Sequence, residues 1–155
     1  MAANQGTLFE HVLLPVASVN DARETARAVL ARLSGQVDRV TIVTVVERSQ
    51  GWPDIVPKNH RIELGEEALE TARRLFEQEG VAIETRLQPA YDTAMAIHEL
   101  AEDIGATAIV FTPRNKGRLA DFFTGDTSWQ LIKKARCPVL VVPPEVDSGD
   151  VGRTA

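Results

Sequence analysis

A basic loop that leads into a helix is the feature of this sequence with the clearest chemical meaning. The loop carries Arg114, Lys116 and Arg118, and Gly125 and Asp126 then open the predicted helix. The backbone amides at a helix N-terminus are free, and the helix dipole is positive there, so both favour an anion. This arrangement indicates a site for a phosphate or a similar small anion.

Other chemistries have weaker support. Ser128 lies near the same helix start, but nothing marks a histidine as its base and no G-x-S-x-G motif is present. His11, His60 and His98 lack the i, i+4 spacing that presents a metal from one helix, so we expect each to be satisfied or exposed and we predict no metal site. The single cysteine, Cys137, excludes an internal disulfide, and its place at the start of an apolar run predicts a buried structural thiol.

Alternating strands and helices must position this loop. Apolar or β-branched runs predict strands covered on both faces, and apolar residues at helical spacing predict the helices between them. The predicted strands span residues 11–16, 37–47, 81–88, 107–111 and 137–142. The predicted helices span residues 21–34, 61–79, 92–104 and 126–135. This alternation predicts an α/β fold, a three-layer open parallel sheet with right-handed connections.

Local signals refine the predicted helices. Asp21 with Glu24 resembles a capping box for the first helix, and Asp92 is expected to cap the third. Glycines are expected to end the first three helices, at Gly35, Gly80 and Gly105. Apolar side chains expected to face the core include Leu64 and Met95, and Trp129 is expected either to pack in the core, the favoured interpretation, or to cover the pocket.

Ligands in such a sheet bind beyond the carboxyl ends of the strands. The loops at that edge are 17–20, 48–60, 89–91 and 113–124. The long 48–60 connection contains Trp52, Pro53 and Pro57, which predicts either a hydrophobic clip onto the second helix, the favoured interpretation, or a lid over a pocket.

Composition sets the outer limits. A chain of 155 residues with 44% hydrophobic content is long enough for one domain with a real core, which we place at 8–144, with 1–7 and 145–155 as flexible termini. The net charge of -5 disfavours non-specific binding to nucleic acid or an anionic membrane. No run approaches the ~18 apolar residues of a membrane span, so we expect a cytoplasmic protein.

The sequence resembles the universal stress protein family. The resemblance is carried by VLLPVA, by TIVTVVE, by the basic loop, and above all by G-D-T-S-x-x-L-I-K-K-A-R-C-P-V-L-V-V, and it extends from about His11 to Pro143. It implies a five-stranded sheet in the order 3-2-1-4-5 with four helices, the adenine-nucleotide alpha-hydrolase-like or half-Rossmann fold. It also implies a homodimer paired through the last strand. The pairing residues would be Val139, Leu140, Val141 and Val142.

Some members of that family bind ATP and others do not. The binders carry a glycine, two residues, another glycine, nine residues, and then glycine followed by serine or threonine. With Gly125 as the last glycine, the two earlier glycine positions fall on Thr112 and Asn115, and the hydroxyl position falls on Asp126. The family's aspartate after the first strand falls on Ala17, and the backbone contact to adenine falls on Val45. Arg114 and Thr127 complete the family's nucleotide-site positions.

These departures weaken a triphosphate site. Glycine lets the backbone approach a phosphate, whereas Thr112 is β-branched and Pro113 donates no amide. A carboxylate about 4 Å from a phosphate charge is repelled by about 1 kcal/mol in water and about 4 near a protein surface. We expect Asp126, at or near the N-cap, to accept hydrogen bonds from the amide of Ser128 or Trp129 and so to fill the anion site from within.

Three functional classes stay open. The favoured one is a dimeric, non-catalytic regulatory or stress-response protein that binds no cofactor and has an unidentified regulatory protein as a partner. The second is a switch of the same family that binds ATP or AMP. The third is an enzyme or carrier for a small anionic molecule at the same strand ends, for which the sequence offers no named base or nucleophile.

Overall fold

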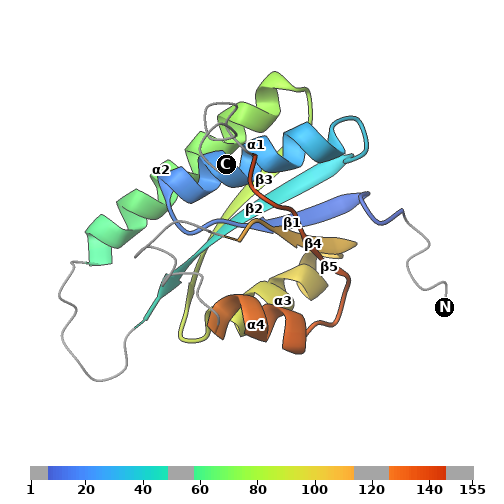
Figure 1. Ribbon diagram of the computed structural model, residues 1–155. Helices are drawn as coiled ribbons and strands as arrows, with labels where there is room; N and C mark the ends of the chain where they lie inside the picture. The colour runs from blue at the N-terminus through green and yellow to red at the C-terminus, as the bar shows by residue number, and fades with distance from the viewer. Residues whose placement is uncertain (1–6, 49–57, 114–125, 146–155) are drawn as a thin grey trace, which may run out of the picture.

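The computed structural model describes residues 7–48, 58–113 and 126–145 of the chain. Strands and helices alternate along it, as the hydrophobic pattern predicts (Figure 1). The elements are β1 His11–Pro15, α1 Val19–Leu33, β2 Arg39–Glu47, α2 Lys58–Gln78, β3 Ala82–Ala90, α3 Thr93–Ile104, β4 Ala108–Phe111, α4 Asp126–Lys133 and β5 Val139–Val141. Among these helices, none combines the length and the hydropathy needed to cross a membrane.

The strands form one parallel sheet in the order β3-β2-β1-β4-β5, which confirms the predicted fold class and topology. β1 is the central strand, and Val12 pairs with Val40 of β2 on one side and with Ala108 of β4 on the other. The winding direction reverses between β1 and β4. In open α/β sheets, the carboxyl ends of the strands at such a point form the usual ligand crevice.

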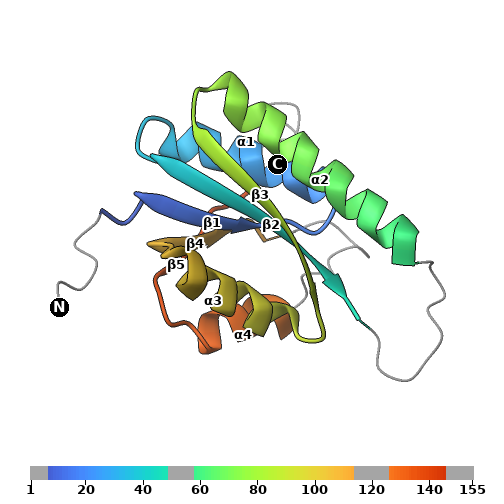
Figure 2. The ribbon, with the colours of Figure 1, turned by 180° about the vertical axis from the view of Figure 1, so that it is seen from behind.

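Helices cover both faces of the sheet, α1 and α2 on one face and α3 and α4 on the other (Figures 1 and 2). Because side chains alternate along a strand, Val12 and Leu14 of β1 pack in the core beneath α1 and α2, while Leu13 packs in the core beneath α3 and α4. All three are fully buried, and burial of such a side chain contributes about 1.5–3 kcal/mol.

Helix termini follow the predicted signals with one correction. Asp92 caps α3 by accepting from the Met95 amide at 3.0 Å, and Gly105 ends α3 in the left-handed conformation at φ +68°. α1, however, begins at Val19 rather than at Asp21, because its N-cap is Ser18. The predicted Asp21–Glu24 capping box is therefore wrong. Positive φ at Gly35 and Gly80 fits the other two predicted stops.

Several side chains that were predicted to lie in the core are exposed instead. Leu64, Met95 and Trp129 are 46%, 43% and 58% exposed, because each lies at the margin of an amphipathic stripe that covers only one face of an open sheet. Cys137 is half-buried rather than buried. β5 is also shorter than predicted, and Cys137 and Pro138 precede it. The proposed clip or lid around Trp52 lies outside the described residues.

Candidate functional site

Predicted site positions from the three central strands meet at one edge of the sheet. Ala17 lies two residues after the end of β1, and Val45 lies in β2, two residues before its end. Thr112 directly follows β4. Ala17 is exposed, Val45 is half-buried, and Thr112 is 3% exposed. The structure therefore brings these three positions to the crevice where the winding direction reverses.

The remaining predicted positions belong to the basic loop and to the helix after it. Arg114, Asn115 and Gly125 lie outside the described residues. Asp126 is the first residue of α4, and Thr127, half-buried, follows it in the first turn. The position of Asp126 agrees with a role at the helix start, and its capping hydrogen bonds stay a prediction.

The buried carboxylate of Asp21 accepts a hydrogen bond from the backbone amide of Ala17, just after the end of β1. Asp21 is 2% exposed, and its Oδ2 accepts from the Ala17 amide at 2.7 Å, while Oδ1 accepts from the Thr25 hydroxyl at 3.3 Å. In return, the Asp21 amide donates to Ser18 Oγ at 3.2 Å. This arrangement resembles a capping box that reaches one residue further back. The spacing Ser18-x-x-Asp21 was the signal in the sequence that could have revealed it.

Glu47 places a second carboxylate at this edge, at the end of β2. Its backbone oxygen accepts from Arg61 Nη1 at 2.8 Å, and its Oε1 accepts from the Thr93 hydroxyl at 2.8 Å. These bonds tie the end of β2 to the beginnings of α2 and α3. Acidic groups therefore stand beside the ends of both β1 and β2, which does not favour a polyanion there.

Thr112 contributes a buried hydroxyl to the same edge. Within the part of the chain that the structure describes, its Oγ1 has no hydrogen-bond partner. A buried hydroxyl without a partner costs free energy, so such a group commonly marks a place for a water or a ligand. The sequence identifies this position only as one where the glycine of the ATP-binding members is lost, because a missing partner depends on the groups nearby in space.

The histidines lie away from this edge or make other bonds. His11 and His98 are buried and hydrogen-bonded, to Thr41 Oγ1 and to the Leu131 carbonyl oxygen, and His60 is exposed, in line with the prediction. In residues 7–48, 58–113 and 126–145 there is no group of three or more His, Cys, Asp or Glu side chains that could hold a metal ion.

The model of the Universal stress protein family matches residues 8–143. A universal stress protein of Methanocaldococcus jannaschii is 38% identical over 80 residues, which is 52% of this chain and 46% of that protein, so the match spans about half the length of the curated relative.

Solved structures of this family share the fold. A protein of the universal stress protein family from Burkholderia pseudomallei superposes with a TM-score of 0.66 at 26% identity, over 89% of this chain and 98% of that one. A universal stress protein from Archaeoglobus fulgidus in complex with dAMP superposes with a TM-score of 0.63 at 23% identity, over 88% and 99% of the two chains.

Proposed function

Because the chain belongs to the universal stress protein family, we propose that it is a non-catalytic, cytoplasmic regulatory or stress-response protein that does not bind ATP. One observation carries this proposal. At the end of β1, where ATP-binding relatives place an aspartate, this chain has Ala17, and the Ala17 amide is bound by the carboxylate of Asp21.

The electrostatic consequence disfavours a triphosphate. Ala17 offers a methyl group where an acceptor for the nucleotide would be needed, and the Ala17 amide and the Thr25 hydroxyl hold the charge of Asp21 in place. Two like charges about 4 Å apart repel by about 4 kcal/mol near a protein surface, and ATP carries several negative charges. Asp126 adds a further carboxylate at the start of α4, at the position of the family's hydroxyl residue.

A second candidate is a switch that binds a nucleoside monophosphate such as AMP. The buried, unpartnered hydroxyl of Thr112 among the described residues favours it, because a ligand could supply the missing partner. The related Archaeoglobus fulgidus protein is in complex with dAMP. A monophosphate carries less charge than ATP, so the repulsion from Asp21 and Asp126 is smaller.

Nucleotide analysis tests the proposal. Nucleotide released from the purified protein by heat is measured by absorbance at 260 nm, and MgATP and AMP are titrated by calorimetry. We expect no released nucleotide and no heat of ATP binding. A dissociation constant for MgATP in the low micromolar range would refute the proposal, and saturable binding of AMP alone would establish the second candidate.

A pair of reversions sharpens this test. The double variant Ala17→Asp with Asp126→Ser restores two family residues, and it should gain measurable ATP binding. The double variant Ala31→Asp with Asp126→Ser, which places the new aspartate at an exposed position on α1, is the control of equal net charge and should gain none. Asp126→Ala alone should lower the melting temperature, because alanine neither accepts a capping hydrogen bond nor complements the helix dipole. An unchanged melting temperature would show that Asp126 does not cap α4.

A homodimer paired through β5 completes the proposed function. β5 is an edge strand, and Val141 on it is 44% exposed. The outer backbone of this strand, beside an apolar side chain, can therefore pair with a second copy of the chain. Val139 and Leu140 are half-buried on the same strand. Val142 follows the strand and is 3% exposed, so its side chain belongs to the core rather than to this edge.

A further inference from the structure

Large apolar side chains are exposed along the β5 side of the molecule. Trp129 and Ile132 of α4 are 58% and 46% exposed, and Val141 of β5 is 44% exposed. α4 lies beneath the β5 side of the sheet, whereas α3 packs against β2 and β3 (Figures 1 and 2). Burial of apolar surface is favourable, so a group of exposed apolar side chains on one side of a protein marks a candidate interaction surface.

Contacts with α3 fix how α4 is turned about its own axis. The Leu131 side chain is fully buried in the core beneath α3 and α4, and its carbonyl oxygen lies 2.9 Å from His98 Nε2 of α3. Further along, Lys134 Nζ lies 3.9 Å from a carboxylate oxygen of Asp92, the N-cap of α3. α3 therefore lies on the side of α4 to which Lys134 points.

Trp129 and Ile132 point away from α3. The Lys134 amide donates to the Gln130 carbonyl oxygen at 2.9 Å, so helical geometry continues through Lys134. Successive residues of an α-helix are turned by about 100°, so Ile132 and Lys134 point to nearly opposite sides. Trp129 and Ile132, three residues apart, lie only about 60° from each other. The apolar pair on α4 therefore faces the same way as the open edge of β5.

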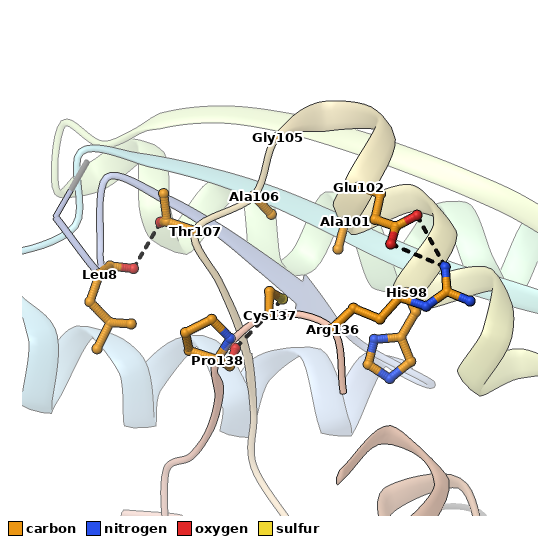
Figure 3. A pocket seen from close by; sticks show the side chains of 10 residues that line it. All are labelled: Leu8, His98, Ala101, Glu102, Gly105, Ala106, Thr107, Arg136, Cys137 and Pro138. Carbon is orange, nitrogen blue, oxygen red and sulfur yellow. Dashed lines mark hydrogen bonds and ion pairs between the residues drawn. The ribbon is translucent and has the colours of Figure 1, made fainter. Parts of the chain in front are cut away.

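The segment from α4 to β5 is also held to α3. Arg136 Nη1 donates to both carboxylate oxygens of Glu102 at 3.1 Å, at the rim of a cavity of about 470 Å³ at the amino ends of the strands (Figure 3). Thr107, Cys137 and Pro138 line this cavity. Because these contacts fix the segment on the α3 side, the opposite, apolar side of α4 is already in place beside β5.

β5 alone is too short to hold two copies of the chain together. It has three residues, Val139–Val141, and two of them are half-buried within their own copy. A stable interface buries about 800 Å² on each partner, and so short a ladder supplies only a small part of that area. A tryptophan side chain alone can bury about 150–250 Å². Trp129 and Ile132 therefore offer the kind of area that the strand lacks.

Symmetry places this area next to the strand. Antiparallel pairing of two identical edge strands relates the two copies by a two-fold axis perpendicular to the sheet. The helices beneath one copy then lie on the same face of the joined sheet as the helices beneath the other. Because α4 is the helix beneath the β5 side, the two α4 helices become neighbours across the axis.

We propose that Trp129 and Ile132 of two copies pack against each other across this axis and extend the β5 pairing into one continuous interface. The occupant of the apolar side of α4 is thus a second copy of this chain. The inference rests on the proposed β5 homodimer and assigns the surface that stabilises it. An apolar centre of this kind is typical of homodimer interfaces.

Trp129 reports its own burial. The chain has two tryptophans, and in the variant Trp52→Phe only Trp129 remains. Its fluorescence is recorded while the protein concentration is raised through the dimer dissociation constant, which sedimentation equilibrium provides. We expect the emission to shift to shorter wavelengths and acrylamide quenching to weaken as the dimer forms, because the indole ring leaves water. With Val141→Lys added, neither change should occur at the same concentrations.

Matched substitutions test the helix contact. Ile132→Lys should raise the dimer dissociation constant at least about tenfold, because it buries an unpaired charge between two copies. Leu64→Lys is the control, since Leu64 is also 46% exposed but lies on α2, which covers the other face of the sheet. It should leave the dissociation constant unchanged. If circular dichroism shows that Ile132→Lys does not fold, Trp129→Gln takes its place and should weaken the dimer several-fold.

The possible failures are distinguishable. A dimer whose Trp129 emission does not change, and which Ile132→Lys leaves intact, would overturn the α4 contact while the β5 pairing stands. A natural chain that is monomeric at every concentration would overturn both. A concentration-dependent shift of Trp129 emission that persists with Val141→Lys would overturn the continuous interface, because α4 would then bind a second copy without β5.

Discussion

His11 shows how one polar side chain can belong to the centre of a sheet. It is 6% exposed in β1, and its Nε2 lies 2.7 Å from the hydroxyl oxygen of Thr41. Burial lowers the pKa of His11 from 6.5, Arg39 lowers it further, and Glu84 opposes the shift. The folded state therefore binds a proton at this position less readily than the unfolded chain does.

The sign of the pH dependence follows. Above about pH 6.5, His11 is neutral in both states and its contribution to stability is fully present. As the pH falls through 6.5 toward the lowered folded pKa, the unfolded chain takes up the proton first, and stability is lost. Between about pH 7.5 and 5.5, the melting temperature of the natural chain should therefore fall more than that of His11→Gln, as measured by calorimetry. His60→Gln, at an exposed histidine, is the control, and an equal effect of both variants would contradict the role of His11.

The resemblance to the family, rather than residue types, assigned Ala17, Val45 and Thr112 to the candidate site. They lie together because parallel strands all end on one side of the sheet, and their part in binding stays a prediction. The unpartnered hydroxyl of Thr112 could not be predicted, since it depends on which groups lie nearby in space.

At the scale of elements, the start of α1 illustrates how a cap decides a boundary. Periodicity predicted the helix but placed its start at Asp21, because Asp21 is itself a good cap residue. The side chain of Ser18 accepts from the Asp21 amide, and this earlier bond adds the residues from Val19 to the helix. Strands and helices could be predicted because their patterns repeat over many residues, whereas each end depends on one or two hydrogen bonds.

Replacement of that cap should be measurable. Ser18→Ala should lower the free energy of unfolding by about 1 kcal/mol, the usual cost of losing an N-cap hydrogen bond. Urea denaturation measures the change. Ser34→Ala, at the exposed C-terminal end of the same helix, should change it by less than about 0.5 kcal/mol. Equal effects of the two variants would show that Ser18 does not cap α1.

At the scale of the whole molecule, the two outer strands of the sheet, β3 and β5, differ in the polarity of their exposed side chains. The β3 edge is polar and charged, with Glu84 lying 4.0 Å from Arg39 and 3.8 Å from Arg86. The β5 edge carries Val141, which is 44% exposed. Charged side chains protect an edge strand from pairing, and apolar ones do not, so this difference supports association through β5.

A substitution on each edge tests the proposed dimer. Val141→Lys should raise the dimer dissociation constant at least tenfold, because it buries an unpaired charge between two copies. Thr85→Lys, exposed on β3, is the matched control and should leave dissociation unchanged. Sedimentation equilibrium measures both variants. A natural chain that stays monomeric at every concentration would contradict the proposed pairing.

The shortness of β4 has a practical consequence for experiments on this protein. Thr107 precedes the strand at the cavity and Thr112 follows it at the nucleotide-type crevice, with only Ala108–Phe111 between them. At a rise of about 3.3 Å per residue, the five steps from Thr107 to Thr112 hold the two locations roughly 16 Å apart. Two small ligands, one in the crevice and one in the cavity, can therefore bind at the same time without contact with each other. Saturating the location at one end of the strand leaves the location at the other end accessible for an independent titration.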